Sequence, residues 1–439
     1  MLLREVEQRT GIIRRFAACF RDYRDPRLKD APNSNSPIRT SPAVAFKACG
    51  SSLLSFILSV LYFRLPDYMK VAIIHDWLNG LRGGEKVLEA ILELYPHATI
   101  YTLFHERGKV SPFIESHRIV ASWLQSIPGV YRHYRNLLPL FPAAIESWDL
   151  REFDLVISSS HAVAKGVRAQ GALHICYCHT PMRYVWDAED YYALGALRHA
   201  AFRAVRPRLQ RWDCEAAARV DHFIANSRFV QERIREYYGR SAEVVHPPID
   251  THYFTPPALN QREDFYLAAG ALVSYKRFDI VVQAFNANHR RLVVAGDGPD
   301  LQRLRRMATR NIDVRGWVTS EELRRLYRTA RGLVFAARED FGMVAVEAQA
   351  CGCPVIAYGA GGSLETVQDG VNGILFAEQH PDDVIRAIHR FELQAWPLEQ
   401  VRFRTETFSR ESFKTRIKKF VEERQNQNQE RRGLTLQPA

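Results

Sequence analysis

Short apolar runs alternate with longer segments of helical apolar spacing along most of the chain from Met69 onward. The short runs predict strands, and the longer segments predict helices. In the first half, the predicted strands occupy residues 71–77, 99–104, 153–160, 172–179 and 222–227. The clearest predicted helix is GGEKVLEAILEL at 83–94. Strands separated by helices indicate parallel β-α-β units, which bind ligands at the carboxyl ends of their strands.

The same alternation restarts after His-Pro-Pro-Ile-Asp at residues 246–250. Two consecutive prolines favour extended backbone and remove hydrogen-bond donors, which suits a link between domains. Beyond it, strands are predicted at 265–272, 291–298, 332–337 and 354–358. We expect an α/β protein with two Rossmann-like doubly wound domains, residues 69–247 and 248–420, that face each other across a cleft. A polar tail, residues 421–439, is expected to fray.

The residues before Met69 do not follow this pattern. The stretch APNSNSPIRTSP has the composition of a disordered linker. The apolar run at 53–63 is shorter than the roughly 20 residues that a membrane-spanning helix needs. We therefore expect residues 1–68 to be an N-terminal extension, mostly disordered, with one short apolar segment.

The seven cysteines are scattered, apart from two Cys-x-Cys pairs at 176/178 and 351/353. This distribution is not that of a disulfide framework, and the spacing does not match a structural zinc site. We expect buried thiols in a reducing compartment, hence a cytoplasmic protein, and we expect no metal ion and no bound cofactor.

The formal net charge of +11 suits a nucleic acid, an anionic lipid or a phosphate-bearing ligand. Much of this charge lies in the arginine-rich segment 198–219. That segment is either a solvated helix face broken at Pro207 or a basic surface for a membrane or an acceptor phosphate. The aromatic and basic residues at 131–134 fit a nucleic acid or a surface near a lipid acceptor.

Several residues with ligand-binding chemistry follow the predicted strands. Gly83 and Gly84 open a helix, where free backbone amides favour an anion, although a tight turn would also need glycine. Lys276 and Arg277 lie just past a strand end, where they neutralise a phosphate or face solvent. The Ala-Gly-Asp-Gly-Pro-Asp turn at 295–300 lacks the third glycine of a dinucleotide fingerprint.

The stretch REDFGMVAVEAQACGCPVIAYGAGGSLE, residues 338–365, combines more of these features than any other. Glu339 falls in a loop at a strand end, and Glu347 falls in the helix that follows. A carboxylate accepts hydrogen bonds from sugar hydroxyls or from a ribose diol. The helix start at Gly342 and Met343 offers amides to a phosphate, and Gly361-Gly362 can bring more backbone close.

The motif E-x-F-G-x-x-x-x-E-A-x-A-x-G-x-P-V-I-A at 339–357 is accompanied by LVSYKR at 272–277, VAGDGP at 294–299 and NSRFVQERI at 226–234. Together they resemble the retaining glycosyltransferases of family 4, which have the GT-B fold. The segments SSSHAVAKGV (158–167) and CYCHTPMRYVWD (176–187) resemble the branch of O-antigen and exopolysaccharide mannosyltransferases. The resemblance extends from about Met69 to Val421.

The resemblance implies a role for each matching residue. Glu339, with the backbone of Phe341 and Gly342, would bind donor-sugar hydroxyls, and Glu347 would bind the ribose. Lys276 would neutralise the diphosphate.

In the first domain, the resemblance implies that His179 reaches across the cleft to the donor sugar and that Gly83 and Gly84 lie beneath the diphosphate. A histidine hydrogen-bonded at a strand end is the alternative interpretation of His179. Lys165 and Arg183 are weaker candidates for the acceptor or a phosphate.

One position departs from the family pattern. Ala271 stands where many relatives carry an arginine that binds the diphosphate. Arg277 or Arg228 are the candidates to replace it.

The resemblance implies transfer of a hexose, in the first instance mannose from GDP-mannose, to a lipid-linked or growing saccharide in surface polysaccharide synthesis. The anomeric configuration would be retained, with the departing phosphate helping to deprotonate the acceptor. The expected partners are the nucleotide sugar, the saccharide acceptor and an anionic membrane surface contacted from the cytoplasmic side. The alternatives are a sugar-nucleotide epimerase or hydrolase on the same fold, and a basic nucleic-acid-binding protein without catalytic activity.

Overall fold

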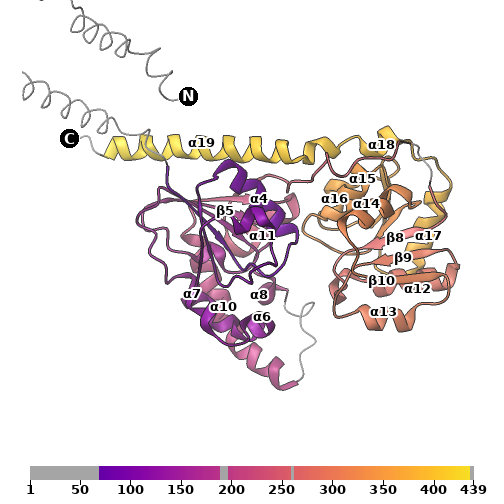
Figure 1. Ribbon diagram of the computed structural model, residues 1–439, viewed down its shortest axis with the longest axis horizontal. Helices are drawn as coiled ribbons and strands as arrows, with labels where there is room; N and C mark the ends of the chain where they lie inside the picture. Colours follow the sequence, from indigo (N-terminus) through magenta and orange to yellow (C-terminus); the bar gives the residue numbers. More distant parts are fainter. Residues whose placement is uncertain (1–68, 188–195, 259–261, 436–439) are drawn as a thin grey trace, which may run out of the picture. The chain divides into compact units, whose positions relative to one another are not determined.

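A computed structural model describes residues 69–187, 196–258 and 262–435, and it contains two parallel β-sheets (Figure 1). The first sheet has seven strands in the order β3-β2-β1-β4-β5-β6-β7. Its strands are β1 (Val71–His75), β2 (Thr99–Thr102), β3 (Ile119–Ala121), β4 (Leu155–Ser160), β5 (Leu173–Cys178), β6 (His222–Ala225) and β7 (Ala242–Val244). Its helices are α4 (Gly83–Leu94), α5 (Pro112–Glu115), α6 (Val130–His133), α7 (Phe141–Ile145), α8 (Arg183–Trp186), α10 (Ala196–Ala218) and α11 (Arg228–Tyr238). Short 3₁₀ turns lie at Trp123–Ser126, Tyr134–Leu140 and Ala164–Gly166.

The second sheet has six strands in the order β10-β9-β8-β11-β12-β13. Its strands are β8 (Tyr266–Ala269), β9 (Leu292–Ala295), β10 (Ile312–Gly316), β11 (Leu333–Phe335), β12 (Val355–Tyr358) and β13 (Gly373–Phe376). Its helices are α12 (Phe278–Asn288), α13 (Leu301–Met307), α14 (Ser320–Thr329), α15 (Met343–Ala350), α16 (Ser363–Thr366), α17 (Pro381–Glu392) and α18 (Leu398–Arg402). Further 3₁₀ turns lie at Ser274–Lys276 and Thr405–Phe408. The predicted fold class, two doubly wound α/β units, is confirmed.

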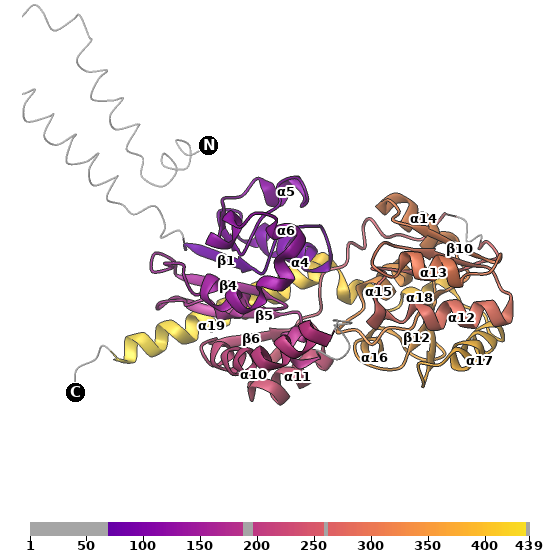
Figure 2. The same ribbon diagram turned by 90° about the horizontal axis from the view of Figure 1, so that it is seen from below.

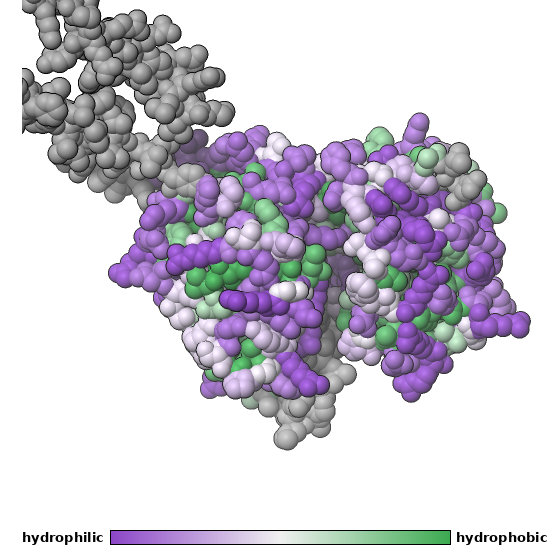
Figure 3. All heavy atoms as spheres, viewed as in Figure 1, coloured by the Kyte–Doolittle hydropathy of each residue, from purple (hydrophilic) through white to green (hydrophobic). Residues whose placement is uncertain are grey.

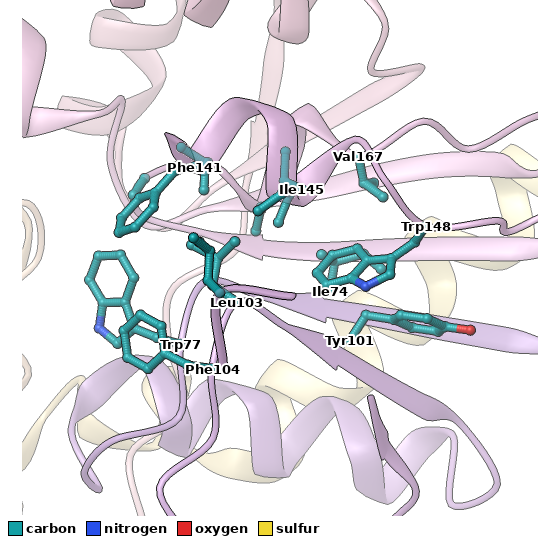
Figure 4. Packing of buried hydrophobic residues seen from close by; sticks show 14 of the residues in the cluster. Ile74, Trp77, Tyr101, Leu103, Phe104, Phe141, Ile145, Trp148 and Val167 are labelled. Atoms are coloured by element: carbon teal, nitrogen blue, oxygen red, sulfur yellow. The ribbon is translucent and has the colours of Figure 1, made fainter. Parts of the chain in front are cut away.

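Both faces of the first sheet are covered by apolar side chains, because successive residues of a strand point to opposite faces. In β1, Ala72 and Ile74 belong to one apolar cluster, and Val71 and Ile73 belong to another. Figure 4 shows the first cluster, in which Tyr101 and Trp148 lie near Ile74, and Trp77, Phe104 and Phe141 form a second group of rings beside Leu103. This burial on both sides explains why the strand is a continuous apolar run.

The C-terminal helix α19 (Arg410–Thr435) returns to the first sheet after the chain has completed the second (Figures 1 and 2). Phe413, Ile417 and Phe420 are buried in the cluster that contains Val71 and Ile73. Arg410 and Lys414 add ion pairs with Glu93 of α4, at 2.6 and 3.0 Å. The residues from 421 to 435, predicted to be a polar tail, continue this helix, and Val421 is buried against the first sheet.

Two further expectations can be compared with the described residues. α10 runs continuously through Pro207, so a helix broken at this residue, which was part of one of the two alternatives, is wrong. Arg203, Arg208 and Arg211 are exposed along α10. Within the described ranges, no helix is both long and apolar enough to cross a membrane. The N-terminal extension, with its apolar run at 53–63, lies outside the described residues.

The surface of the described domains is largely hydrophilic on the face shown in Figure 3, where hydrophilic residues separate the hydrophobic areas.

The two Cys-x-Cys pairs lie in the interior. Cys176 and Cys178 are buried free thiols in β5, and Cys351 and Cys353 are buried free thiols after α15. These cysteines therefore belong to the packed core, as predicted.

Candidate active site

A lysine and a glutamate meet at the carboxyl edge of the second sheet. Lys276 ends the turn that follows β8, and Glu339 lies in the loop that follows β11. Because β8 and β11 are neighbouring parallel strands, both loops leave the same edge of the sheet. Lys276 Nζ lies 2.6 Å from Glu339 Oε1, and the two side chains expose only 13% and 16% of their surface.

The loop that carries Glu339 is held in place by two glycines. The Gly362 N–H donates to the backbone oxygen of Glu339 at 2.8 Å. A Cβ atom at Gly361 would lie 2.3 Å from that same oxygen, and one at Gly362 would lie 2.3 Å from Phe341 Cα. Glycine is therefore required at both positions by the close approach of the two backbones. Phe341 anchors the loop, because its side chain is buried in the second-domain core.

Glu347 contacts a residue of the first domain that the sequence analysis missed. Lys86 of α4 places its Nζ 2.7 Å from Glu347 Oε1. On the other side, the Tyr327 hydroxyl donates weakly to Glu347 Oε2 at 3.4 Å. The Glu347 side chain is 5% exposed, so Lys86 is the counter-ion of a nearly buried carboxylate. The sequence indicates the importance of Lys86 only by its place in the first turn of a helix that begins with two glycines.

Gly83 and Gly84 are the first two residues of α4, and they lie beside the start of α15 and beside His179. A Cβ atom at Gly83 would lie 2.9 Å from the sulfur of Met343, the first residue of α15. A Cβ atom at Gly84 would lie 3.9 Å from His179 Nε2. The amino ends of α4 and α15 are therefore adjacent, and both helix dipoles favour an anion there.

His179 follows β5 and belongs to a hydrogen-bonded chain of side chains. His179 Nε2 lies 2.8 Å from Ser159 Oγ, and the same hydroxyl lies 3.1 Å from His75 Nδ1. His75 Nε2 in turn lies 3.7 Å from Glu85 Oε1. Burial, together with the neighbouring His161 and His75, lowers the pKa of His179 to about 3. The imidazole is therefore neutral near pH 7, so it can offer a ligand hydrogen bonds but not a positive charge.

Asp76 fixes the backbone of the loop that follows β4 by hydrogen bonds. Its carboxylate accepts four backbone N–H groups, those of residues 161–164, at 2.7–3.0 Å. It also lies 3.0 Å from His161 Nδ1. The contact with His161 holds the pKa of Asp76 far below its usual value, although burial opposes this shift. The His-Asp-Trp sequence that begins with His75, the last residue of β1, was the available signal for Asp76.

The weaker candidates are placed in different surroundings. Lys165 is 1% exposed, and its ammonium is paired with Asp213 and donates to the Ala162 carbonyl. This burial overturns its predicted role as an acceptor or phosphate contact. Arg183 forms an ion pair with Asp340, next to Glu339.

The two candidates for replacing the cation at Ala271 also differ in position. Arg277 Nε pairs with Asp279 at 3.3 Å. Arg228 donates its backbone N–H to Glu365 at 2.7 Å, and its side chain is exposed. Neither contact places a guanidinium beside Glu347.

Two family models match consecutive parts of the chain. The model described as Glycosyltransferase Family 4 matches residues 54–253, and the model described as Glycosyl transferases group 1 matches residues 250–410.

Curated relatives are about 30% identical to this chain over the matched residues. A D-inositol 3-phosphate glycosyltransferase of Nocardiopsis dassonvillei is 31% identical over 219 residues, 42% of this chain and 51% of the relative. A GDP-mannose-dependent alpha-(1-6)-phosphatidylinositol monomannoside mannosyltransferase of Mycolicibacterium smegmatis is 31% identical over 193 residues, 37% of this chain and 50% of the relative. The chain thus matches about half the length of these relatives.

Solved structures share the fold at low sequence identity. Anabaena HepE, solved in complex with UDP and glucose, has a TM-score of 0.61 at 18% identity, over 81% of this chain and 99% of HepE. Sucrose-phosphate synthase from Thermosynechococcus elongatus has a TM-score of 0.60 at 19% identity, over 81% and 98% of the two chains.

Proposed function

The chain belongs to the family 4 glycosyltransferases, and we propose that it transfers a hexose from a nucleotide sugar to a saccharide. The observation that carries this proposal is that three groups of residues with ligand-binding chemistry lie close together. These are the Lys276–Glu339 pair, the Glu347 carboxylate and the glycine pair beside His179. Together they would bind the sugar, the diphosphate and the ribose of one nucleotide-sugar molecule.

In this proposal the chain's own groups stabilise the leaving diphosphate. Lys276 and the amides at the start of α15 neutralise the negative charge that develops as the glycosidic bond breaks. Glu339 and neutral His179 bind hydroxyls of the transferred sugar. The sugar keeps its anomeric configuration, and the departing phosphate accepts the acceptor proton on the same face. No metal ion or cofactor is assigned a role.

We propose mannose from GDP-mannose as the donor, because the motifs resemble mannosyltransferases and one relative is named as GDP-mannose-dependent. UDP-glucose is the competing donor, since HepE was solved with UDP and glucose. The acceptor would be a lipid-linked or growing saccharide of a surface polysaccharide.

We place the enzyme in the cytoplasm, in peripheral contact with an anionic membrane. Arg203, Arg208 and Arg211, exposed on α10, are the residues that would meet lipid phosphates. Co-sedimentation of the full chain with vesicles of anionic and of neutral lipid tests this contact. Equal binding to both kinds of vesicle would contradict it.

A thermal-shift panel on the full chain with GDP, UDP, ADP, GDP-mannose and UDP-glucose tests the donor. A ligand at roughly 100 times its Kd stabilises a protein by about 2.7 kcal/mol. Stabilisation by GDP and GDP-mannose alone, lost in Glu347→Gln, is the expected result. Stabilisation by UDP instead would contradict the mannose donor, and silence across the panel would contradict the proposed function.

The alternatives need separate measurements. Conversion of the nucleotide sugar at the same rate with and without a saccharide acceptor would favour the epimerase or hydrolase. Binding of RNA with a steep salt dependence, without any nucleotide-sugar binding, would favour the nucleic-acid-binding protein.

A further inference from the structure

Lys86 connects the two domains at the position proposed for the donor ribose. It lies in α4, one turn after the glycine pair, and its ammonium is 2.7 Å from Glu347 of α15. The Lys86 side chain is 39% exposed, whereas that of Glu347 is 5% exposed. The lysine therefore reaches a buried carboxylate from a side that remains open.

The ammonium has hydrogen-bonding capacity beyond this contact. A lysine carries three N–H donors, and Glu347 Oε1 accepts one of them. The ring of Phe254 lies 5.6 Å from Lys86 Nζ and covers part of the ammonium. Because the side chain is partly exposed, a second acceptor such as a phosphate oxygen can approach it.

Most cations that the sequence offers for the diphosphate already have carboxylate partners. Ala271 provides no positive charge, Arg277 is paired with Asp279, and Lys276 is paired with Glu339. Arg183 is also committed, since it pairs with Asp340. A diphosphate placed against the adjacent starts of α4 and α15 carries more than one negative charge, so Lys276 alone does not balance it.

We propose that Lys86 is a donor-binding residue that bridges Glu347 and the diphosphate of the nucleotide sugar. It thereby adds a cation from the first domain to the groups of the second domain. This inference rests on the proposed function, in which Glu347 binds the ribose. The ribose and the first phosphate share one ester linkage, so a cation bound to the ribose-binding carboxylate lies within reach of that phosphate.

The test compares a nucleoside with its diphosphate on the full chain. The Kd values of guanosine and GDP, and of uridine and UDP, are measured by calorimetry for the wild type, Lys86→Met and Lys86→Gln. Loss of the partner of Glu347 affects nucleoside and diphosphate alike, so the ratio of the two Kd values isolates the phosphate contact. We expect the advantage of the diphosphate over its nucleoside to fall by about tenfold or more in both variants.

Lys70→Met is the matched control, because Lys70 forms an exposed ion pair with Glu152 in the same domain. This control should leave the ratio unchanged. An unchanged ratio in the Lys86 variants, with the wild type binding GDP or UDP, would overturn the inference and leave the proposed function standing. Failure of the wild type to bind any of the four ligands would instead overturn the proposed function.

Discussion

Lys276 and Glu339 stand 2.6 Å apart, on loops that follow two neighbouring strands, β8 and β11. Each side chain is mostly buried and serves as the counter-charge of the other. The pair places a hydrogen-bond acceptor for hydroxyls directly beside a cation for phosphate. A nucleotide sugar carries a phosphate and a hydroxyl on adjacent carbon atoms of its sugar ring. One ligand can therefore contact both Lys276 and Glu339.

Replacing Glu339 with glutamine should separate sugar binding from diphosphate binding. The amide keeps the size of the side chain but loses the charge that accepts hydroxyl hydrogens in the transition state. We expect the rate of transfer to fall by on the order of 100-fold. The Kd of the nucleoside diphosphate alone should change by less than about threefold, because Lys276 keeps its charge.

Steady-state kinetics and calorimetry on the same preparation measure the two quantities. Glu321→Gln, an exposed carboxylate in the first turn of α14, is the control and should alter neither. A large loss of diphosphate affinity in Glu339→Gln would contradict the assignment of this residue to the sugar.

Ser159 is expected to position His179, because its hydroxyl lies within hydrogen-bond distance of both His179 and His75. In Ser159→Ala the imidazole loses its fixed orientation. We expect transfer to slow by about tenfold, while diphosphate affinity stays the same. The control is Ser158→Ala, whose hydroxyl contacts His174. A control variant as slow as Ser159→Ala would show that the loss arises from general damage to β4.

Docking of α19 should contribute measurably to the stability of the first domain. Ile417 is 2% exposed in the cluster around Val71 and Ile73. Truncation to alanine leaves a cavity there, and we expect a loss of about 2–4 kcal/mol in unfolding free energy. Lys418→Ala, on the exposed side of the helix, should cost almost nothing. Equal melting temperatures for the two variants would contradict the packing of this helix.

The strands that the sequence predicts are those buried on both faces. β1 and β12 are continuous apolar runs, and such runs are readable without a structure. β3, β7, β10 and β13 were not predicted, and they are the four edge strands of the two sheets. β3, β7 and β10 are half-buried or carry polar residues, and β13 is only four residues long. Such strands have no distinctive pattern in the sequence.

The site residues follow a similar division. The positions of Glu339 and Lys276 could be predicted, since each lies just past the end of a strand that is an apolar run. Lys86 could not, because its partner Glu347 is 261 positions away along the chain. Lys165 was misassigned for the same physical reason. Lys165 also follows a strand. Nothing near it in the sequence reveals that its ammonium forms a buried ion pair with Asp213, 48 positions later.

Stability should decrease as the pH falls from 7 to 5. Burial lowers the pKa of His174 and of His179 from 6.5 to about 3 in the folded chain. Below pH 6.5 the unfolded chain binds protons at these positions and the folded chain does not, so protonation favours unfolding. Each histidine should cost about 2 kcal/mol at pH 5, as an order of magnitude. Asp76 and Glu85 contribute little here, because their lowered pKa values affect stability mainly below about pH 4.5.

Melting temperatures of the full chain at pH 5, 6, 7 and 8 measure this effect. In His174→Asn the dependence on pH should become shallower, because one of the two buried histidines is gone. His389→Asn removes an exposed histidine of α17 and should leave the profile of the wild type intact. A wild-type melting temperature that stays constant or rises from pH 7 to pH 5 would mean that these imidazoles accept protons in the folded state. His179 could then act as a cation in the site, and its assignment as a neutral hydrogen-bonding group would have to be abandoned.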